Sequence, residues 1–169
     1  MNIIFDTSTH AETVHLGRLL AGMLRPGMVV ALRGDLGAGK TTLVKGIASG
    51  LTGIDERDVT SPTFTILQEY NGPVTLYHVD AYRLDSARDL DAVGFDDCVD
   101  GSGVTVVEWA DRVSEALPGE ALIVTIEQTG DQQRRFCLQA ATPQQARDLK
   151  RLSGMLRAGD GRTDEHTSG

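Results

Sequence analysis

The segment from Gly34 to Thr41 constrains the fold of this chain more than any other, because it matches the pattern G-x-x-x-x-G-K-[ST] at every position. It follows Met28–Leu32, a valine-rich apolar run bounded by Pro-Gly, which is typical of a strand buried on both faces. Apolar side chains then recur at helical spacing from Leu43 to Leu51. A glycine-containing loop between a buried strand and a helix predicts a phosphate-binding loop in an α/β fold.

The residue types within this loop fit the binding of a nucleoside triphosphate. Its glycines let successive backbone amides curl around phosphates, and the helix that begins near Gly39 points its positive end at the anion. Lys40 supplies a charge for the β and γ phosphates, and the Thr41 hydroxyl is placed to ligate Mg²⁺. A glycine-rich turn that binds nothing is the alternative, and the complete match argues against it. The predicted nucleotide-binding residues are Gly34, Asp35, Leu36, Gly37, Ala38, Gly39, Lys40, Thr41 and Thr42.

Helix and strand patterns alternate along the rest of the chain. Thr9 and Glu12 form a Thr-x-x-Glu capping pattern, which predicts a helix that starts there and stops at Pro26. Alternating apolar residues separated by turn residues predict two hairpins, 63–70 with 74–79 and 122–126 with 136–140, and 104–107 is a further buried strand. The acidic segment 85–100 is expected to hold a short helix and a loop, and a last helix opens at Pro143.

These elements predict an α/β fold of the P-loop three-layer sandwich type, with a mainly parallel central sheet and antiparallel hairpin additions. A chain of 169 residues with 40% apolar side chains suits one core, so we assign a single domain to 1–157. Residues 158–169 are small and polar, which predicts a disordered tail.

The composition limits the location and the partners of the protein. The formal net charge of −8 would repel nucleic-acid phosphates, so a role with nucleic acid should be indirect. The longest apolar run, Met28–Leu32, is far shorter than the ~20 residues of a membrane-spanning helix. The N-terminus has no signal-peptide pattern, so we expect a cytoplasmic protein without a membrane role. Cys98 and Cys137 are expected to be reduced thiols.

Two carboxylates are candidates for a site beside the phosphate loop. Asp80 follows the strand pattern that ends at Val79, and Glu108 follows the one that ends at Val107. Ligands bind at the carboxyl ends of strands in open α/β sheets, so both acids are predicted to face one Mg²⁺ and the catalytic water. Spacing leaves open which acid ligates the metal directly and which polarises water. A solvated acid at a strand end is the alternative for each.

Three further residues near these patterns have two interpretations each. Thr63, in Ser61-Pro62-Thr63, is either a switch-like threonine that reaches Mg²⁺ or the γ phosphate, or part of a plain turn. Trp109 is either a contact for a base or partner, or a packed core aromatic. His78 is expected to be a histidine whose hydrogen bonds are satisfied within its strand. The chain lacks the Asn-Lys-x-Asp pattern that reads guanine, which favours adenine.

Four blocks together resemble one family, the TsaE proteins of bacterial tRNA N6-threonylcarbamoyladenosine synthesis. The blocks are Gly34–Leu43, Ser61–Phe64, His78–Leu84 and Glu108–Trp109, in the order typical of the family. The resemblance covers roughly residues 9–140, and four ordered blocks are far more specific than any one of them. Within that range the chain departs from the family pattern after Leu84, and beyond Ala140 a basic helix and a tail extend it.

The resemblance implies an ATP- and Mg²⁺-binding domain with slow intrinsic hydrolysis that depends on the partner proteins TsaB and TsaD. In such systems TsaD transfers the threonylcarbamoyl group to adenosine 37 of tRNA, and the TsaE-like component hydrolyses ATP to support turnover of the complex. The family pattern implies phosphate contact for Lys40, a metal role for Thr41, metal and water roles for Asp80 and Glu108, and a switch role for Thr63. Contact with tRNA would be indirect, through the complex.

Two other functions fit parts of the pattern. A stand-alone P-loop kinase of a small molecule would need a lid that excludes water, usually with arginines. Arg134, Arg135 and the basic C-terminal helix are the only arginine-bearing candidates after the nucleotide core. A nucleotide-gated binding module with little turnover overlaps with the ATPase interpretation.

Overall fold

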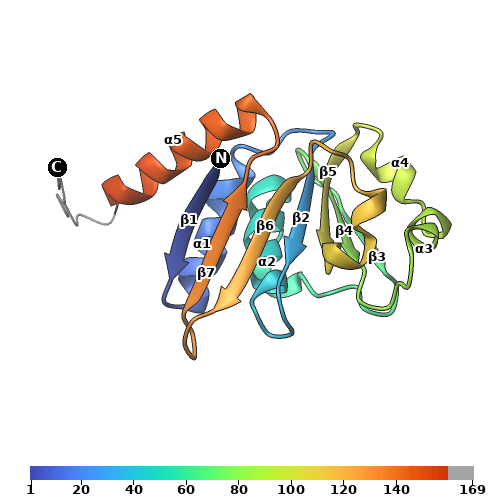
Figure 1. Cartoon of the computed structure of the whole chain (residues 1–169), viewed down its shortest axis with the longest axis horizontal. Coiled ribbons are helices and arrows are strands. Elements are labelled where there is room, and N and C mark those ends of the chain that lie inside the picture. Colours follow the sequence, from blue (N-terminus) through green and yellow to red (C-terminus); the bar gives the residue numbers. More distant parts are fainter. Residues whose placement is uncertain (160–169) are drawn as a thin grey trace.

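A single seven-stranded sheet forms the centre of the molecule (Figure 1). The structure, a computed structural model, describes residues 1–159. Its strands are β1 Asn2–Thr7, β2 Val29–Arg33, β3 Leu67–Tyr70, β4 Thr75–Asp80, β5 Gly103–Glu108, β6 Leu122–Gln128 and β7 Arg134–Gln139. Its helices are α1 His10–Ala21, α2 Lys40–Thr52, α3 Ala87–Ala92, α4 Phe95–Val99 and α5 Pro143–Gly159, with short 3₁₀ helices η1 Glu56–Asp58 and η2 Ala110–Ala116.

The centre of the sheet is parallel and its edges are antiparallel. The strand order is β1-β7-β6-β2-β5-β4-β3. β2 pairs in parallel with β5 and β6, and β4 pairs in parallel with β5. The pairs β1–β7, β6–β7 and β3–β4 are antiparallel. The carboxyl ends of β2, β4 and β5 therefore lie at the same edge of the sheet.

Helices cover both faces of the sheet and form two separate apolar clusters. The first cluster takes residues from α1, α2 and α5, and the second takes residues from α3, α4 and η2. β2 supplies Val30 and Leu32 to the first and Val29 and Ala31 to the second. A central strand buried on both faces is what its continuous apolar run predicts. The predicted three-layer sandwich, with a parallel centre and two hairpin additions, is confirmed.

The structure differs from the prediction in the strand of the first hairpin. Residues 63–66 form a turn, and β3 begins only at Leu67. Ile66 has a φ of 68°, and its amide donates to the Pro62 carbonyl at 2.6 Å. Thr63 donates to Asp80 Oδ2 at 3.2 Å. Tertiary contacts with the site thus override the strand preference of the segment, and the prediction of a strand over 63–66 was wrong.

Three other elements differ in detail from the prediction. The acidic segment 85–100 folds into two short helices, α3 and α4. β1, which the sequence patterns did not reveal as a strand, pairs along β7 at the edge of the sheet. α5 continues to Gly159, so residues 158 and 159 are helical and not part of a tail. The rest of the predicted tail, 160–169, lies outside the described residues.

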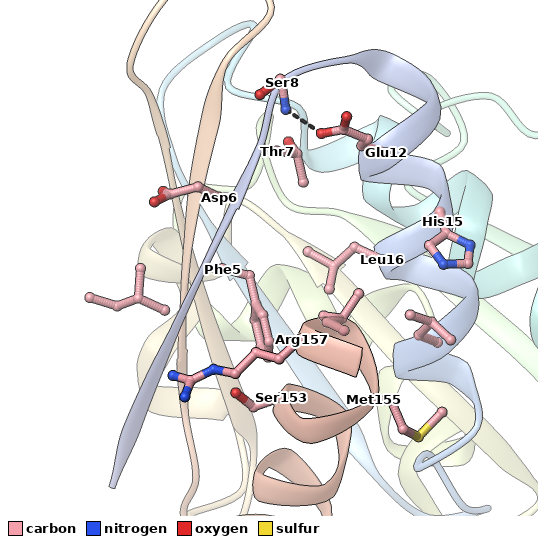
Figure 2. A pocket seen from close by; sticks show the side chains of 13 residues that line it. Phe5, Asp6, Thr7, Ser8, Glu12, His15, Leu16, Ser153, Met155 and Arg157 are labelled. Atoms are coloured by element: carbon pink, nitrogen blue, oxygen red, sulfur yellow. Dashed lines mark hydrogen bonds between the residues drawn. The ribbon is translucent and has the colours of Figure 1, made fainter. Parts of the chain in front are cut away.

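The start of α1 is capped as its sequence predicts, with a small change in one bond. Thr9 Oγ1 accepts from the Glu12 amide at 3.1 Å. The Glu12 carboxylate accepts from the Ser8 amide at 2.6 Å (Figure 2), one residue before the position of a standard capping box.

A pocket of about 830 Å³ lies beside this cap, between β1, α1 and the last turns of α5 (Figure 2). It shares no lining residue with the Gly34–Thr41 segment.

The two cysteines of the chain, Cys98 and Cys137, are both free thiols, as expected. Burial raises the pKa of the Cys98 thiol.

Throughout residues 1–159, no helix has both the length and the apolar character that crossing a membrane requires.

Glycines bring α1 and α2 into close contact. A Cβ on Gly46 of α2 would overlap the Val14 carbonyl oxygen, and one on Gly17 of α1 would overlap the Leu43 carbonyl oxygen. The two helix backbones therefore approach more closely than larger residues permit. Because α2 follows directly after the Gly34–Gly39 loop, this contact also helps to fix the position of the loop.

Replacing Gly46 by alanine should lower the free energy of unfolding by about 3 kcal/mol, since the added methyl group forces the helices apart. Urea unfolding followed by circular dichroism measures the change. Gly154→Ala in α5 is the matched control, because its Cβ would meet no atom within 4 Å. That variant should gain about 0.5–1 kcal/mol from helix propensity. A Gly46→Ala protein as stable as the control would contradict the close helix contact.

Candidate functional site

The Gly34–Gly39 loop connects the end of β2 to the start of α2 at the carboxyl edge of the sheet. Gly37 and Gly39 have φ values of 77° and 108°, in the left-handed region that favours glycine. No side chain caps the first turn of α2 at Gly39. The amides of this turn consequently face outward without a side-chain acceptor, as an anion site at a helix N-terminus requires.

Lys40 is folded back onto its own loop. Its Nζ donates to the carbonyls of Gly34 at 2.5 Å and Asp35 at 2.8 Å. The same Nζ lies 3.9 Å from the centre of the Trp109 ring, a cation–π distance. Burial lowers the pKa of the Lys40 ammonium, and the negative charge of Glu108 is the largest of the effects that oppose this shift. The cation is therefore held by its own loop and by the ring of Trp109.

Asp80 and Glu108 form a buried pair of acids beside the loop. They are register partners at the ends of the parallel strands β4 and β5, and their residues are 4% and 2% exposed. Ser61 Oγ contacts both carboxylates, at 2.6 Å from Asp80 Oδ2 and 3.1 Å from Glu108 Oε2. The structure thus brings the two acids together, as the strand-end argument predicts.

The two predicted hydroxyl residues lie on these acids. Thr41 of α2 donates to Glu108 Oε1 at 2.7 Å, and Thr63 donates to Asp80 Oδ2 at 3.2 Å. The Tyr82 amide donates to the other Asp80 oxygen at 2.9 Å. Thr41, Thr63, Asp80 and Glu108 therefore lie in one hydrogen-bonded cluster. Lys40 lies outside it, because its ammonium bonds to its own loop.

The sequence analysis missed Ser61, which bridges the two carboxylates. It stands two residues before Thr63, within the same Ser-Pro-Thr block. A hydroxyl residue on each side of a proline was the available signal. The bridging contact arises from the turn over 63–66, which strand patterns do not reveal.

His78 differs from the expectation of a satisfied strand histidine. Its Nε2 lies 3.0 Å from Glu108 Oε2, and its residue is fully buried. Its Nδ1 is buried and has no hydrogen-bond partner within residues 1–159. The ring is thus only half satisfied, and its polar contact is with the acid cluster.

Aromatic and cationic side chains cover Lys40. Trp109, at a φ of 57°, stacks at a tilt on Tyr82 with ring centres 5.0 Å apart. The Arg112 guanidinium lies 5.2 Å from the Tyr82 ring and 5.9 Å from the Trp109 ring. Trp109 is partly buried and packs against the second apolar cluster, and its ring also lies on the cation of the loop.

Arg134 ties the β6–β7 hairpin to the loop. Its Nη2 donates to the Gly37 carbonyl at 3.3 Å, and its Nη1 lies within 3.1 Å of the carbonyls of Gly130, Asp131 and Gln133. The guanidinium is therefore occupied by backbone acceptors. The loop is fixed by the sheet on one side and by this hairpin on the other.

The oxygen donors of the cluster suit Mg²⁺ better than a metal that needs a full set of protein ligands. Among residues 1–159, no group of three or more His, Cys, Asp or Glu side chains is arranged to hold a metal. Mg²⁺ is commonly bound through one or two carboxylates, a hydroxyl and substrate phosphates. Thr41, Asp80 and Glu108 offer that set, and their oxygens are already linked through hydrogen bonds.

The fold and the loop define a class of protein, the mixed α/β domains with a glycine-rich phosphate-loop sequence between a central strand and a helix. Within this class, the model of the family described as threonylcarbamoyl adenosine biosynthesis protein TsaE matches residues 7–136, and the chain belongs to that family. The matched range contains all of the predicted site residues. The resemblance read from the four sequence blocks is confirmed.

Relatives support the same assignment. The Bacillus subtilis tRNA threonylcarbamoyladenosine biosynthesis protein TsaE is 49% identical over 131 residues, which cover 76% of this chain and 80% of the relative. The Treponema pallidum protein of the same name is 46% identical over 125 residues, which cover 74% and 91%. The crystal structure of Bacillus subtilis YdiB superposes with a TM-score of 0.75 at 37% identity, covering 92% of this chain and 96% of YdiB.

Proposed function

We propose that the protein is a Mg²⁺-dependent ATPase of the tRNA threonylcarbamoyladenosine pathway, which acts in the cytoplasm with TsaB and TsaD to support turnover of the modifying complex. The family membership supports the pathway. The activity rests on one observation: Thr41, Asp80 and Glu108 converge beside the Gly34–Gly39 loop, where a triphosphate held by that loop would end.

The loop residues Gly34 to Thr42 would hold the phosphates of ATP. Free amides in the first turn of α2 favour the anion, and Lys40 exchanges its contacts with Gly34 and Asp35 for phosphate oxygens. The carbonyls that Lys40 leaves and the phosphates that it meets both accept through oxygen, so the ammonium stays hydrogen-bonded throughout.

Thr41, Asp80 and Glu108 would hold Mg²⁺, which supplies positive charge that neutralises the charge developing on the transferred phosphoryl group. Glu108 would also accept a hydrogen bond from the attacking water and orient it. Thr63, hydrogen-bonded to Asp80, is placed to contact the γ phosphate in the manner of a switch threonine.

The charge of the chain and the position of Arg134 bear on the alternatives. A formal net charge of −8 supports indirect contact with tRNA, through the partners.

A kinase would need arginines free to close over an acceptor, whereas the Arg134 guanidinium is occupied by four backbone carbonyls. These contacts disfavour the kinase.

Lys40→Ala should weaken the affinity for ATP at least tenfold, because the variant loses a buried charge that meets the phosphates. Isothermal titration calorimetry with ATP and Mg²⁺ measures the change. Lys45→Ala, in the same helix but outside the loop, is the control and should bind as the wild type does. If Lys40→Ala binds ATP with wild-type affinity, the loop is not the phosphate site.

The wild-type protein alone should hydrolyse ATP slowly, and adding purified TsaB and TsaD should accelerate the release of phosphate. Steady-state phosphate release with and without the partners measures this. Unchanged turnover on mixing would count against the partnership. Fast phosphorylation of a small molecule by the protein alone would favour the kinase.

Glu108→Gln should keep ATP affinity within a few-fold of the wild type and lose hydrolysis by about 100-fold, because the amide fits the space but lacks the negative charge that holds and orients the attacking water. Calorimetry and phosphate release on the same sample separate the two effects. Glu127→Gln, an exposed change on β6, is the control. Normal hydrolysis by Glu108→Gln would remove this residue from the mechanism.

A further inference from the structure

The neighbours of His78 in the sheet include apolar residues of the first cluster. Leu76, His78 and Asp80 alternate on the face of β4 that packs toward α2, beside Val106 of the neighbouring strand. The His78 residue has no solvent exposure. A buried polar ring in such a row costs free energy unless its nitrogens are hydrogen-bonded.

Only one nitrogen of this ring has a partner. Nε2 lies 3.0 Å from Glu108 Oε2, and Nδ1 is buried and unpaired among the described residues. Since a carboxylate oxygen accepts only, Nε2 carries the hydrogen and donates it. The ring therefore donates to Glu108 through Nε2, while its Nδ1 has no hydrogen-bond partner among the described residues.

The other donors to Glu108 are shared with further groups. Ser61 has a single hydroxyl hydrogen and lies closer to Asp80 Oδ2, at 2.6 Å, than to Glu108 Oε2, at 3.1 Å. Thr41 donates to Oε1, but its hydroxyl is the group proposed to bind Mg²⁺. His78 is therefore the one donor to Glu108 without a second acceptor and without a proposed ligand role.

We infer that His78 is a positioning residue for Glu108: by donating from Nε2 it holds Oε2 toward the sheet and presents Oε1 to Thr41 and the phosphate end of the site. This inference rests on the proposed ATPase function. The effect of His78 is confined to the orientation of the Glu108 carboxylate, which has one rotatable bond more than the carboxylate of an aspartate.

Two substitutions of similar length separate orientation from packing. His78→Gln carries an amide donor near the position of Nε2, and His78→Met fills a similar volume without a donor. His78→Met should lower kcat for ATP hydrolysis about tenfold or more and leave the ATP dissociation constant within about twofold of the wild type. His78→Gln should recover most of the lost kcat.

Tyr77→Phe is the matched control, because Tyr77 is the preceding residue on β4 and its hydroxyl contacts only Ser102. It should hydrolyse ATP as the wild type does. Phosphate release with TsaB and TsaD gives kcat, calorimetry gives the ATP affinity, and thermal unfolding reports the fold. If His78→Met does not fold, His78→Asn replaces it, since its shorter amide cannot reach Glu108.

Three outcomes would overturn the inference. Wild-type kcat in His78→Met would show that Glu108 needs no such donor. Equal losses of kcat in the glutamine and methionine variants would assign His78 to packing. A wild-type protein that neither binds nor hydrolyses ATP would overturn the proposed function itself, whereas the first two results leave that function in place.

Discussion

The parallel pairing of β4 with β5 is the constraint on which the site depends. It sets Asp80 opposite Glu108, and both acids are buried. Two neighbouring carboxylates in a low-dielectric environment repel each other and lose their hydration, which is costly unless donors surround them. The polar groups around the pair answer this requirement, because each of them donates to a carboxylate oxygen.

These donors come from separate parts of the chain. Thr41 belongs to α2, Ser61 and Thr63 to the turn before β3, and His78 to β4. These segments meet near the strand ends at one edge of the sheet. The β6–β7 hairpin adds Arg134, so the loop and the acids are braced by elements on both sides of β2.

Sequence patterns predicted the class of fold and the main site residues for local reasons. The Gly34–Thr41 motif has a fixed spacing, and Asp80 and Glu108 each follow a strand that its apolar run reveals. The Gly34–Thr41 motif alone allows many topologies. The acids converge because β5 lies beside β2 and β4 lies beside β5, an order that the sequence patterns left open.

What the patterns missed depends on register and tertiary contact. The contact of His78 with Glu108 follows from the pairing of two strands, and no local pattern carries that information. Ser61 reaches both acids because Ile66 turns the chain, against the strand preference of its neighbours. β1 was hidden because it is short, partly exposed and lacks turn residues that would mark a hairpin; Ile4 in it is 58% exposed.

The self-contact of Lys40 has a consequence for any anion that enters the loop. Two carbonyls and an aromatic ring already satisfy the ammonium, so an arriving ligand replaces bonds instead of adding them. The affinity that Lys40 adds is therefore the difference between a charged phosphate oxygen and a neutral carbonyl as acceptors of the same ammonium. Once an anion leaves, the same carbonyls and ring can take the ammonium back, so the lysine is never left without a partner.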